Sequence, residues 1–210
     1  MQIELSSRIT LEKDGDSPDY YQQFFVTFCG RIFDTDENDE ETNVGTITAV
    51  LIDADRAAQA GLDLWHAADA YAGDIEAVTE TFFEDGKLGT EVLGDLDIWL
   101  PNLLYIQRVE VKQQYRGKGI GLAAIRRVID LLRVNCDVVA LKPFPLQFEG
   151  KVTPTNRKEA QTATIKLKRY YRRMGFKGVT GTDYMILNLA HRLRDVLLEP
   201  DSYAEDGEID

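Results

Sequence analysis

The stretch YRGKGIG, residues 115–121, combines glycines with basic side chains, and this combination suits the binding of an anion. Its glycines are Gly117, Gly119 and Gly121. Glycine lets the backbone approach a ligand closely, and backbone N–H groups at the start of a helix attract phosphate. Arg116 and Lys118 add positive charge. A tight strand-to-helix turn with incidental basic residues is the alternative interpretation.

Two common phosphate-binding motifs fit this stretch less well. In the dinucleotide motif G-x-G-x-x-G, the third glycine falls on Leu122 when counting starts at Gly117. When counting starts at Gly119 it falls on Ala124, which that motif tolerates, but the next strand ends in ALKPFP without an acid for a ribose. The nucleotide-binding string G-x-x-x-x-G-K-[ST] does not occur. What remains is R-x-x-G-x-G, preceded by RVEV.

The elements around this loop predict an α/β unit. LLYIQRVEV (103–111) reads as a strand, and a helix is expected at 119–134 from its apolar stripe. CDVVALK then predicts a strand, a second helix runs to Met174 before Gly175, and 183–189 predicts the last strand. The loop therefore lies between the carboxyl end of a strand and a helix, where open sheets bind ligands.

The first half of the chain predicts strands at 2–12 and 20–33 and a hairpin over 22–53 with a polar tip. A helical segment is expected at 54–98, with Phe82 and Phe83 on its apolar stripe. Before the second helix, Asn156 and Glu159 are expected to form an N-cap pair. The sequence suggests one domain over 1–198 and a disordered acidic tail over 199–210.

Composition points to a soluble cytoplasmic protein. No apolar run reaches the roughly 18–20 residues that span a bilayer, no secretory signal is evident, and two distant cysteines suit a reducing compartment. Residues 101–180 hold 17 Lys and Arg against five Asp and Glu, whereas the remainder holds seven against 31. This distribution suggests that an anion binds in the basic segment, while the rest of the surface prefers cations.

No metal is expected. DTDENDEETN resembles a calcium-binding loop, but Asp39 occupies the position of its required glycine and Gly45 that of its closing glutamate. We interpret it as the hairpin tip. His66 and His191 have no partner at ligand spacing, so a zinc site is not expected either.

YRGKGIG after the VEV strand, followed later by YYRRMGF, resembles the GNAT superfamily of acyl-CoA-dependent N-acyltransferases over residues 103–189. The resemblance implies a mixed, mostly antiparallel twisted sheet flanked by helices, which is an α/β (α+β) fold. It also implies acetyl-CoA as cosubstrate, with its pyrophosphate on the glycine loop and its pantetheine arm along the preceding strand. The implied coenzyme-binding residues are Val109, Val111, Arg116, Gly117, Lys118, Gly119, Ile120 and Gly121.

The same resemblance implies that Tyr171 protonates the departing coenzyme A thiolate. Tyr170 beside it is the rival, which we interpret as a packing residue. Glu110 projects from the opposite sheet face to Val109 and Val111, so it is a candidate to take a proton from the acceptor amine. An ion pair with Arg108 is the alternative for Glu110.

Two features depart from the family pattern. The helical segment 54–98 precedes the coenzyme-binding strand, which is an atypical insertion, and ALKPFPLQF lacks a polar strand end with an Asn. The sequence thus predicts acetyl transfer to a primary amine, of a cationic small molecule or of a protein lysine. A second copy of the chain is a further candidate partner, whereas a nucleic acid and a membrane are not expected. The alternatives are a non-catalytic coenzyme A sensor or scaffold, and an acyltransferase acting on charged tRNA.

Overall fold

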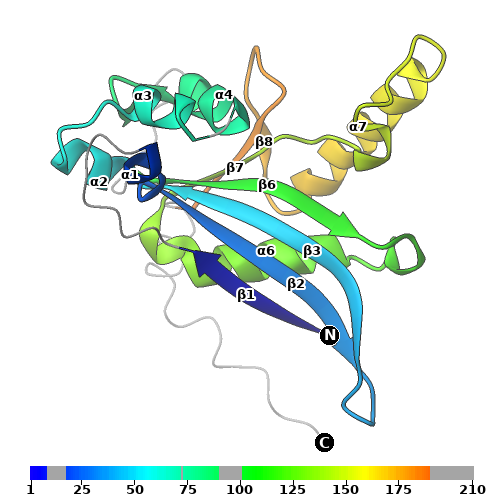
Figure 1. The fold of residues 1–210 in the computed structure, drawn as a ribbon. Coiled ribbons are helices and arrows are strands. Elements are labelled where there is room, and N and C mark those ends of the chain that lie inside the picture. Colours follow the sequence, from blue (N-terminus) through cyan, green and yellow to red (C-terminus); the bar gives the residue numbers. More distant parts are fainter. Residues whose placement is uncertain (9–17, 72, 90–100, 190–210) are drawn as a thin grey trace, which may run out of the picture.

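The computed structural model describes residues 1–8, 18–71, 73–89 and 101–189, and a seven-stranded sheet forms its centre (Figure 1). Its strands are β1 (Gln2–Arg8), β2 (Phe25–Thr35), β3 (Glu41–Ile52), β6 (Leu103–Val111), β7 (Val138–Leu141), β8 (Lys177–Gly178) and β9 (Met185–Asn188). The order is β1-β2-β3-β6-β7-β9-β8, and every neighbouring pair is antiparallel except β6 and β7. The expected architecture, a mostly antiparallel mixed sheet flanked by helices, is confirmed.

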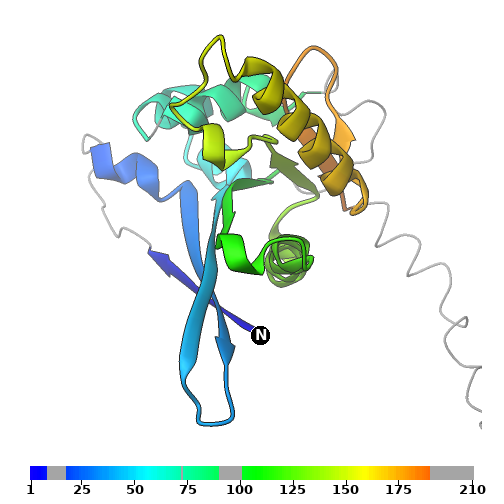
Figure 2. The same ribbon diagram turned by 90° about the vertical axis from the view of Figure 1, so that its right-hand side faces the viewer.

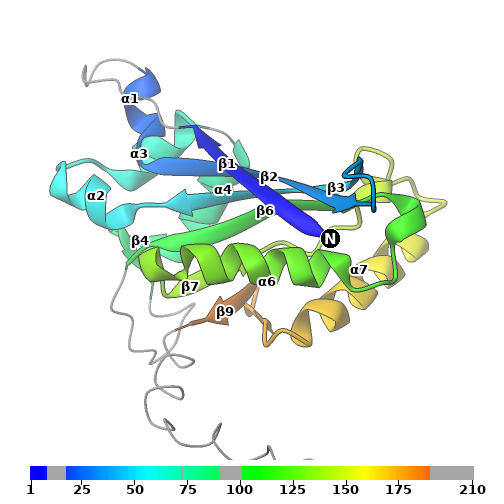
Figure 3. The same ribbon diagram turned by 90° about the horizontal axis from the view of Figure 1, so that it is seen from below.

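Helices cover both faces of this sheet (Figures 1 and 3). The helices α2 (Ala54–Gln59), α3 (Leu64–Asp69) and α4 (Gly73–Phe82) lie over one face, and α6 (Ile120–Leu132) lies over the other. Because side chains alternate along a strand, Leu103 and Tyr105 of β6 join the core under α2–α4, whereas Leu104 and Ile106 join the core under α6. In the described part of the chain, no helix is long and apolar enough to cross a membrane.

The β2–β3 hairpin is long and extends beyond the rest of the sheet (Figure 2). Its tip is held by Asp36, whose carboxylate accepts hydrogen bonds from the backbone N–H groups of Asn38 (2.8 Å) and Glu40 (2.9 Å). These two bonds lower the pKa of Asp36, because they stabilise its charged form. The predicted hairpin with a polar tip is therefore confirmed.

The start of the predicted strand 20–33 is wrong. Residues Pro18–Gln22 form the short helix α1, and β2 begins only at Phe25. Proline suits the first position of a helix, and Tyr20 packs edge-on against Phe24, with ring centroids 5.8 Å apart. The expected strand 2–12 is present as β1 up to Arg8; its remaining residues, like the tail 199–210, lie outside the described residues.

The predicted helical segment 54–98 is correct only up to Phe82. There the chain turns into a small hairpin, β4 (Phe83–Glu84) paired with β5 (Lys87–Leu88). The turn residues Asp85 and Gly86 have φ values of 49° and 74°, the left-handed pair that an Asp-Gly hairpin turn uses. Residues 90–98 of the prediction lie outside the described residues, but the helical insertion between β3 and β6 is real.

Helix α7 (Arg157–Arg172) begins directly after Asn156, although the expected capping bond is not formed. The Asn156 side chain instead accepts from the N–H of Thr153 at 2.7 Å and donates to the carbonyl of Lys151 at 2.8 Å. It therefore shapes the loop before the helix rather than the helix itself. Gly175, with φ of +94°, follows the helix as predicted.

Candidate active site

The sheet opens between β6 and β7. Their parallel pairing covers only Leu103–Ile106 against Val138–Leu141. Beyond it, Gln107 is a bulge residue in the pairing of β6 with β3. Pro143 and Pro145 follow β7 and have no N–H to extend the ladder. Within the described residues, the last part of β6 therefore lacks a strand neighbour on this edge, and a cleft forms there.

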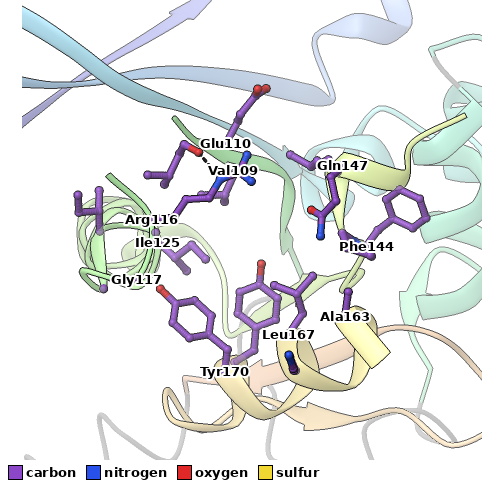
Figure 4. Close-up of a pocket in the computed structure, with 18 of the residues that line it drawn as sticks. Val109, Glu110, Arg116, Gly117, Ile125, Phe144, Gln147, Ala163, Leu167 and Tyr170 are labelled. Carbon is purple, nitrogen blue, oxygen red and sulfur yellow. Dashed lines mark hydrogen bonds between the residues drawn. The ribbon is translucent and has the colours of Figure 1, made fainter. Parts of the chain in front are cut away.

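A cavity of about 570 Å³ occupies this cleft, a size suited to a small molecule (Figure 4). One wall is the end of β6 with the glycine loop, and the other is the segment 144–147 with α7. Every site residue predicted from the sequence lines this cavity except Lys118. The Lys118 ammonium instead lies 5.7 Å from the centre of the Tyr115 ring. The predicted site residues thus lie together around one cavity, with one basic residue outside it.

The backbone of β6 faces this cavity at alternate residues. The N–H of Lys112 donates to Val44 of β3 at 2.9 Å. Since successive N–H groups of a strand point to opposite edges, those of Val109 and Val111 point toward the open edge. The side chains of both valines pack against the core under α6. The strand therefore offers backbone groups to a ligand while its side chains stay anchored.

The glycine loop adopts a conformation that favours glycine. Gly117 and Gly119 have φ values of +81° and +77°, and nothing lies within 4 Å of the place where a Cβ would stand on either. Gly119 is the N-cap of α6, so the loop leads directly into the first N–H groups of the helix. The result is an open stretch of backbone at the positive end of a helix, which suits an anion.

Two adjacent tyrosines of α7 line the cavity with different surroundings. The hydroxyl of Tyr170 accepts a hydrogen bond from the backbone N–H of Leu122 in α6 at 3.2 Å. Our interpretation of Tyr170 as a packing residue alone is therefore incomplete. Tyr171 packs against the core under α6 and lies edge-on to Phe176, with ring centroids 6.2 Å apart. Burial, and secondarily the neighbouring Tyr170, raises the pKa of Tyr171 to about 12.

Glu110 lies on the opposite side of the cavity from Tyr170 (Figure 4), and it makes the ion pair considered for it. Its carboxylate lies 3.6 Å from Nε of Arg108. Arg108 makes two shorter contacts with Glu149, at 3.0 Å from Nη1 and 2.9 Å from Nη2. This pairing, mainly through the side-chain hydrogen bond, lowers the pKa of Glu149. Arg108 thus links β6 to the loop that forms the other wall.

Sequence reasoning missed the loop that forms part of this second wall. Phe144, Gln147 and Glu149 come from the loop after β7, where the sequence shows only the strand-ending prolines. Gln147 points toward the cavity from this side (Figure 4). The signal that could have found them is their position directly after β7, the strand that pairs with β6.

No protein-family model matches the chain, and no curated protein matches it in sequence. Among solved structures, it is similar to a KacTA–DNA complex, with 11% identity, coverage of 95% of this chain and 100% of that one, and a TM-score of 0.45. It is also similar to Arabidopsis thaliana NAA60 in complex with acetyl-CoA, at 15% identity, 89% and 99% coverage and a TM-score of 0.39. Drosophila melanogaster polyamine N-acetyltransferase gives 15% identity, 78% and 74% coverage and a TM-score of 0.42. Because these identities and TM-scores are low, a function for this chain has to be argued from the geometry of its own site.

Proposed function

We propose that this chain is an N-acetyltransferase of the GNAT type, which moves an acetyl group from acetyl-CoA to a primary amine. The observation that carries this proposal is the glycine loop at the start of α6, open to a cavity that runs along the free edge of β6. An anion held by the loop would have the rest of its molecule beside the backbone of Val109 and Val111. That arrangement suits a long ligand with a phosphate group at one end, such as coenzyme A.

The residues present fit this cosubstrate. The loop N–H groups and Arg116 would hold the pyrophosphate, and the open-edge backbone of β6 would hold the pantetheine arm. When bound, acetyl-CoA supplies a thioester whose carbonyl carbon the acceptor amine attacks. A backbone N–H near the end of β6 would polarise that carbonyl. Lys118 would act only through its charge, since it lies outside the cavity.

Proton transfer falls to two side chains of the cavity. As the amine attacks, Glu110 takes its proton, directly or through a water. As the carbon–sulfur bond breaks, the Tyr171 hydroxyl donates to the leaving sulfur. A hydroxyl whose pKa is about 12 stays protonated at physiological pH, so it is always available as a donor. The free thiol leaves with the Tyr171 proton. The proton on Glu110 then returns to the Tyr171 oxygen through solvent, so the products are an amide and a thiol and both side chains are restored.

The charge of the chain supports a cationic acceptor, such as a polyamine, an aminoglycoside or a lysine side chain. Outside residues 101–180 the chain holds 31 Asp and Glu against seven Lys and Arg, which favours the approach of a cation. Turnover of neutral or acidic amines only, in a panel that includes such cations, would overturn this part of the proposal. We further propose that the protein acts in the cytoplasm, since Cys29 and Cys136 are both free thiols.

The proposal is tested by calorimetric titration of acetyl-CoA into the protein and into an Arg116→Ala/Gly119→Trp double variant. We expect micromolar binding that the double variant loses. No binding to the wild-type chain would mean that the glycines form only a turn, and the enzyme proposal would fail. Coenzyme binding without turnover of any amine would instead favour a sensor or scaffold.

A second candidate is acyl transfer to charged tRNA, and the exposure of α7 favours it. Among the residues of this helix only Ala160 is buried. Lys166, Arg169 and Arg172 are exposed and would meet a phosphate backbone. Retention of tRNA that falls steeply with salt would support this candidate. Absence of retention at low salt would remove it.

A further inference from the structure

The contact between Leu122 and Tyr170 joins the start of α6 to α7 beside the cavity. Leu122 lies in the first turn of α6, where backbone N–H groups have no partner within the helix. Its N–H donates to the hydroxyl oxygen of Tyr170, 48 residues further along the chain. A side chain of α7 therefore takes up one of the donors that make the start of α6 attractive to anions.

The Tyr170 hydroxyl keeps a proton of its own to donate. Accepting a hydrogen bond uses a lone pair of the phenol oxygen and leaves its O–H free. Within the described residues, the bond from Leu122 is the hydrogen bond that this hydroxyl makes. The ring lines the cavity that the glycine loop also lines. The Tyr170 hydroxyl therefore accepts from the Leu122 N–H and can donate its own proton to a ligand in the cavity.

Gly121 keeps the space beside this hydroxyl open. A Cβ at Gly121 would stand 3.6 Å from the Tyr170 hydroxyl, 3.7 Å from Val109 and 3.8 Å from Val111. These are ordinary contact distances, so a methyl group would fit but a longer side chain would fill the gap. The hydroxyl, the open edge of β6 and the start of α6 thus converge at one glycine.

We infer that Tyr170 is a phosphate-binding residue of the coenzyme site, which adds a side-chain donor to the backbone donors of the loop. This inference rests on the proposed function, because it assigns a contact to the same coenzyme. The α6 N–H polarises the phenol oxygen, and the phenol O–H in turn donates to a phosphate oxygen. A donor at the positive end of a helix dipole favours an anion further. The neighbouring Tyr171, half-buried against the core, keeps the separate role at the sulfur.

The test compares Tyr170→Phe with Tyr171→Phe, which removes the same hydroxyl from the adjacent position. Calorimetry would measure three probes: acetyl-CoA, acetyl-pantetheine without phosphates, and inorganic pyrophosphate. We expect Tyr170→Phe to weaken acetyl-CoA and pyrophosphate about tenfold, the value of one hydrogen bond to a charged group. The affinity of Tyr170→Phe for acetyl-pantetheine should equal that of the wild type. Tyr171→Phe should bind acetyl-CoA and pyrophosphate with wild-type affinity.

Unchanged pyrophosphate affinity in Tyr170→Phe would overturn the inference. Equal weakening of acetyl-pantetheine would also overturn it, because Tyr170 would then only hold α6 in place. If the wild type binds pyrophosphate but not acetyl-CoA, the proposed function fails while the pyrophosphate comparison still decides the role of Tyr170. Binding of neither probe would defeat both. As a second readout, a given concentration of pyrophosphate should shift the Leu122 amide signal in nuclear magnetic resonance spectra more in the wild type than in Tyr170→Phe.

Discussion

Arg116 reaches back from the glycine loop to the strand before it, and its Nε donates to the carbonyl oxygen of Val111 at 2.8 Å. This bond uses one of the five N–H donors of the guanidinium and leaves the planar fork of the other nitrogens. One side chain therefore fixes the loop against β6 and carries positive charge at the cavity wall. The shape of the loop and its charge depend on the same residue.

Replacing Arg116 by Ala should therefore weaken acetyl-CoA binding by about tenfold or more, since both the clamp and a charge-assisted contact are lost. Lys118→Ala is the matched control. It removes one positive charge, as Arg116→Ala does, but from a side chain that lies outside the cavity. Lys118→Ala should weaken acetyl-CoA binding less than Arg116→Ala does. Its effect should shrink as the salt concentration rises, because salt screens the charge. Equal losses in the two variants, measured by calorimetry, would show that only net charge matters.

Gly119→Ala tests the conformation of the loop. Its φ of +77° is costly for a residue with a side chain, so the variant should lose roughly 1–2 kcal/mol of unfolding free energy. Coenzyme binding should fall with it. Gly178→Ala is the control, since that glycine has no positive φ and open space around it. It should change neither urea unfolding nor binding; similar effects of both substitutions would contradict the prediction.

Tyr171→Phe should lower kcat by about 100-fold and leave the affinity for acetyl-CoA unchanged. Burial raises the pKa of this phenol to about 12, so its neutral form persists as pH rises past the ordinary tyrosine range. The ratio of wild-type to variant kcat should therefore stay constant between about pH 7 and pH 10. A ratio that collapses toward the upper end of that range would mean that the group in use titrates earlier and is not this tyrosine.

Glu149→Gln should make the free energy of unfolding depend less on pH in the acid range. The Arg108 guanidinium lowers the pKa of the Glu149 carboxyl in the folded chain, so its stabilising effect is present at neutral pH. That effect disappears as pH falls through the lowered pKa. Urea unfolding should show the variant less stable than the wild type near pH 7 and equal to it near pH 2. Because the pair is exposed, the difference should also shrink with salt; a gap that persists in acid would point to another cause.

The central part of the site could be predicted because its signals are local. The β6 strand, the loop and α6 form one continuous stretch of chain in which alternation, glycine spacing and a helical stripe follow one another. The cavity residues on that stretch follow from the same pattern. The expected roles of Tyr171 and Glu110 stay predictions, since geometry places both at the cavity without testing what they do.

The features that could not be predicted from the sequence depend mostly on contacts between residues far apart in the chain. Tyr20 and Tyr21 favour strands locally, yet they lie in a helix whose rings pack on Phe24 and on His66 of α3. The bulge at Gln107 exists only in the register between β6 and β3. The Asp85–Gly86 turn is different, because its two-residue signal was present in the sequence and was outweighed by the helical spacing of the aromatic residues before it.

The parallel pairing of β6 with β7 has a consequence for how the chain folds. The antiparallel hairpin β2–β3 closes through a short tip, whereas Leu103 meets Val138 only after the whole of α6 has crossed between them. Pairings between distant segments cost more loop-closure entropy and form more slowly. The hairpin should therefore be protected first in pulse-labelling hydrogen exchange during refolding, and β7 later. The cleft between β6 and β7 would then be the last part of the sheet to be completed, so a newly made chain would acquire most of its sheet well before it acquires this cavity.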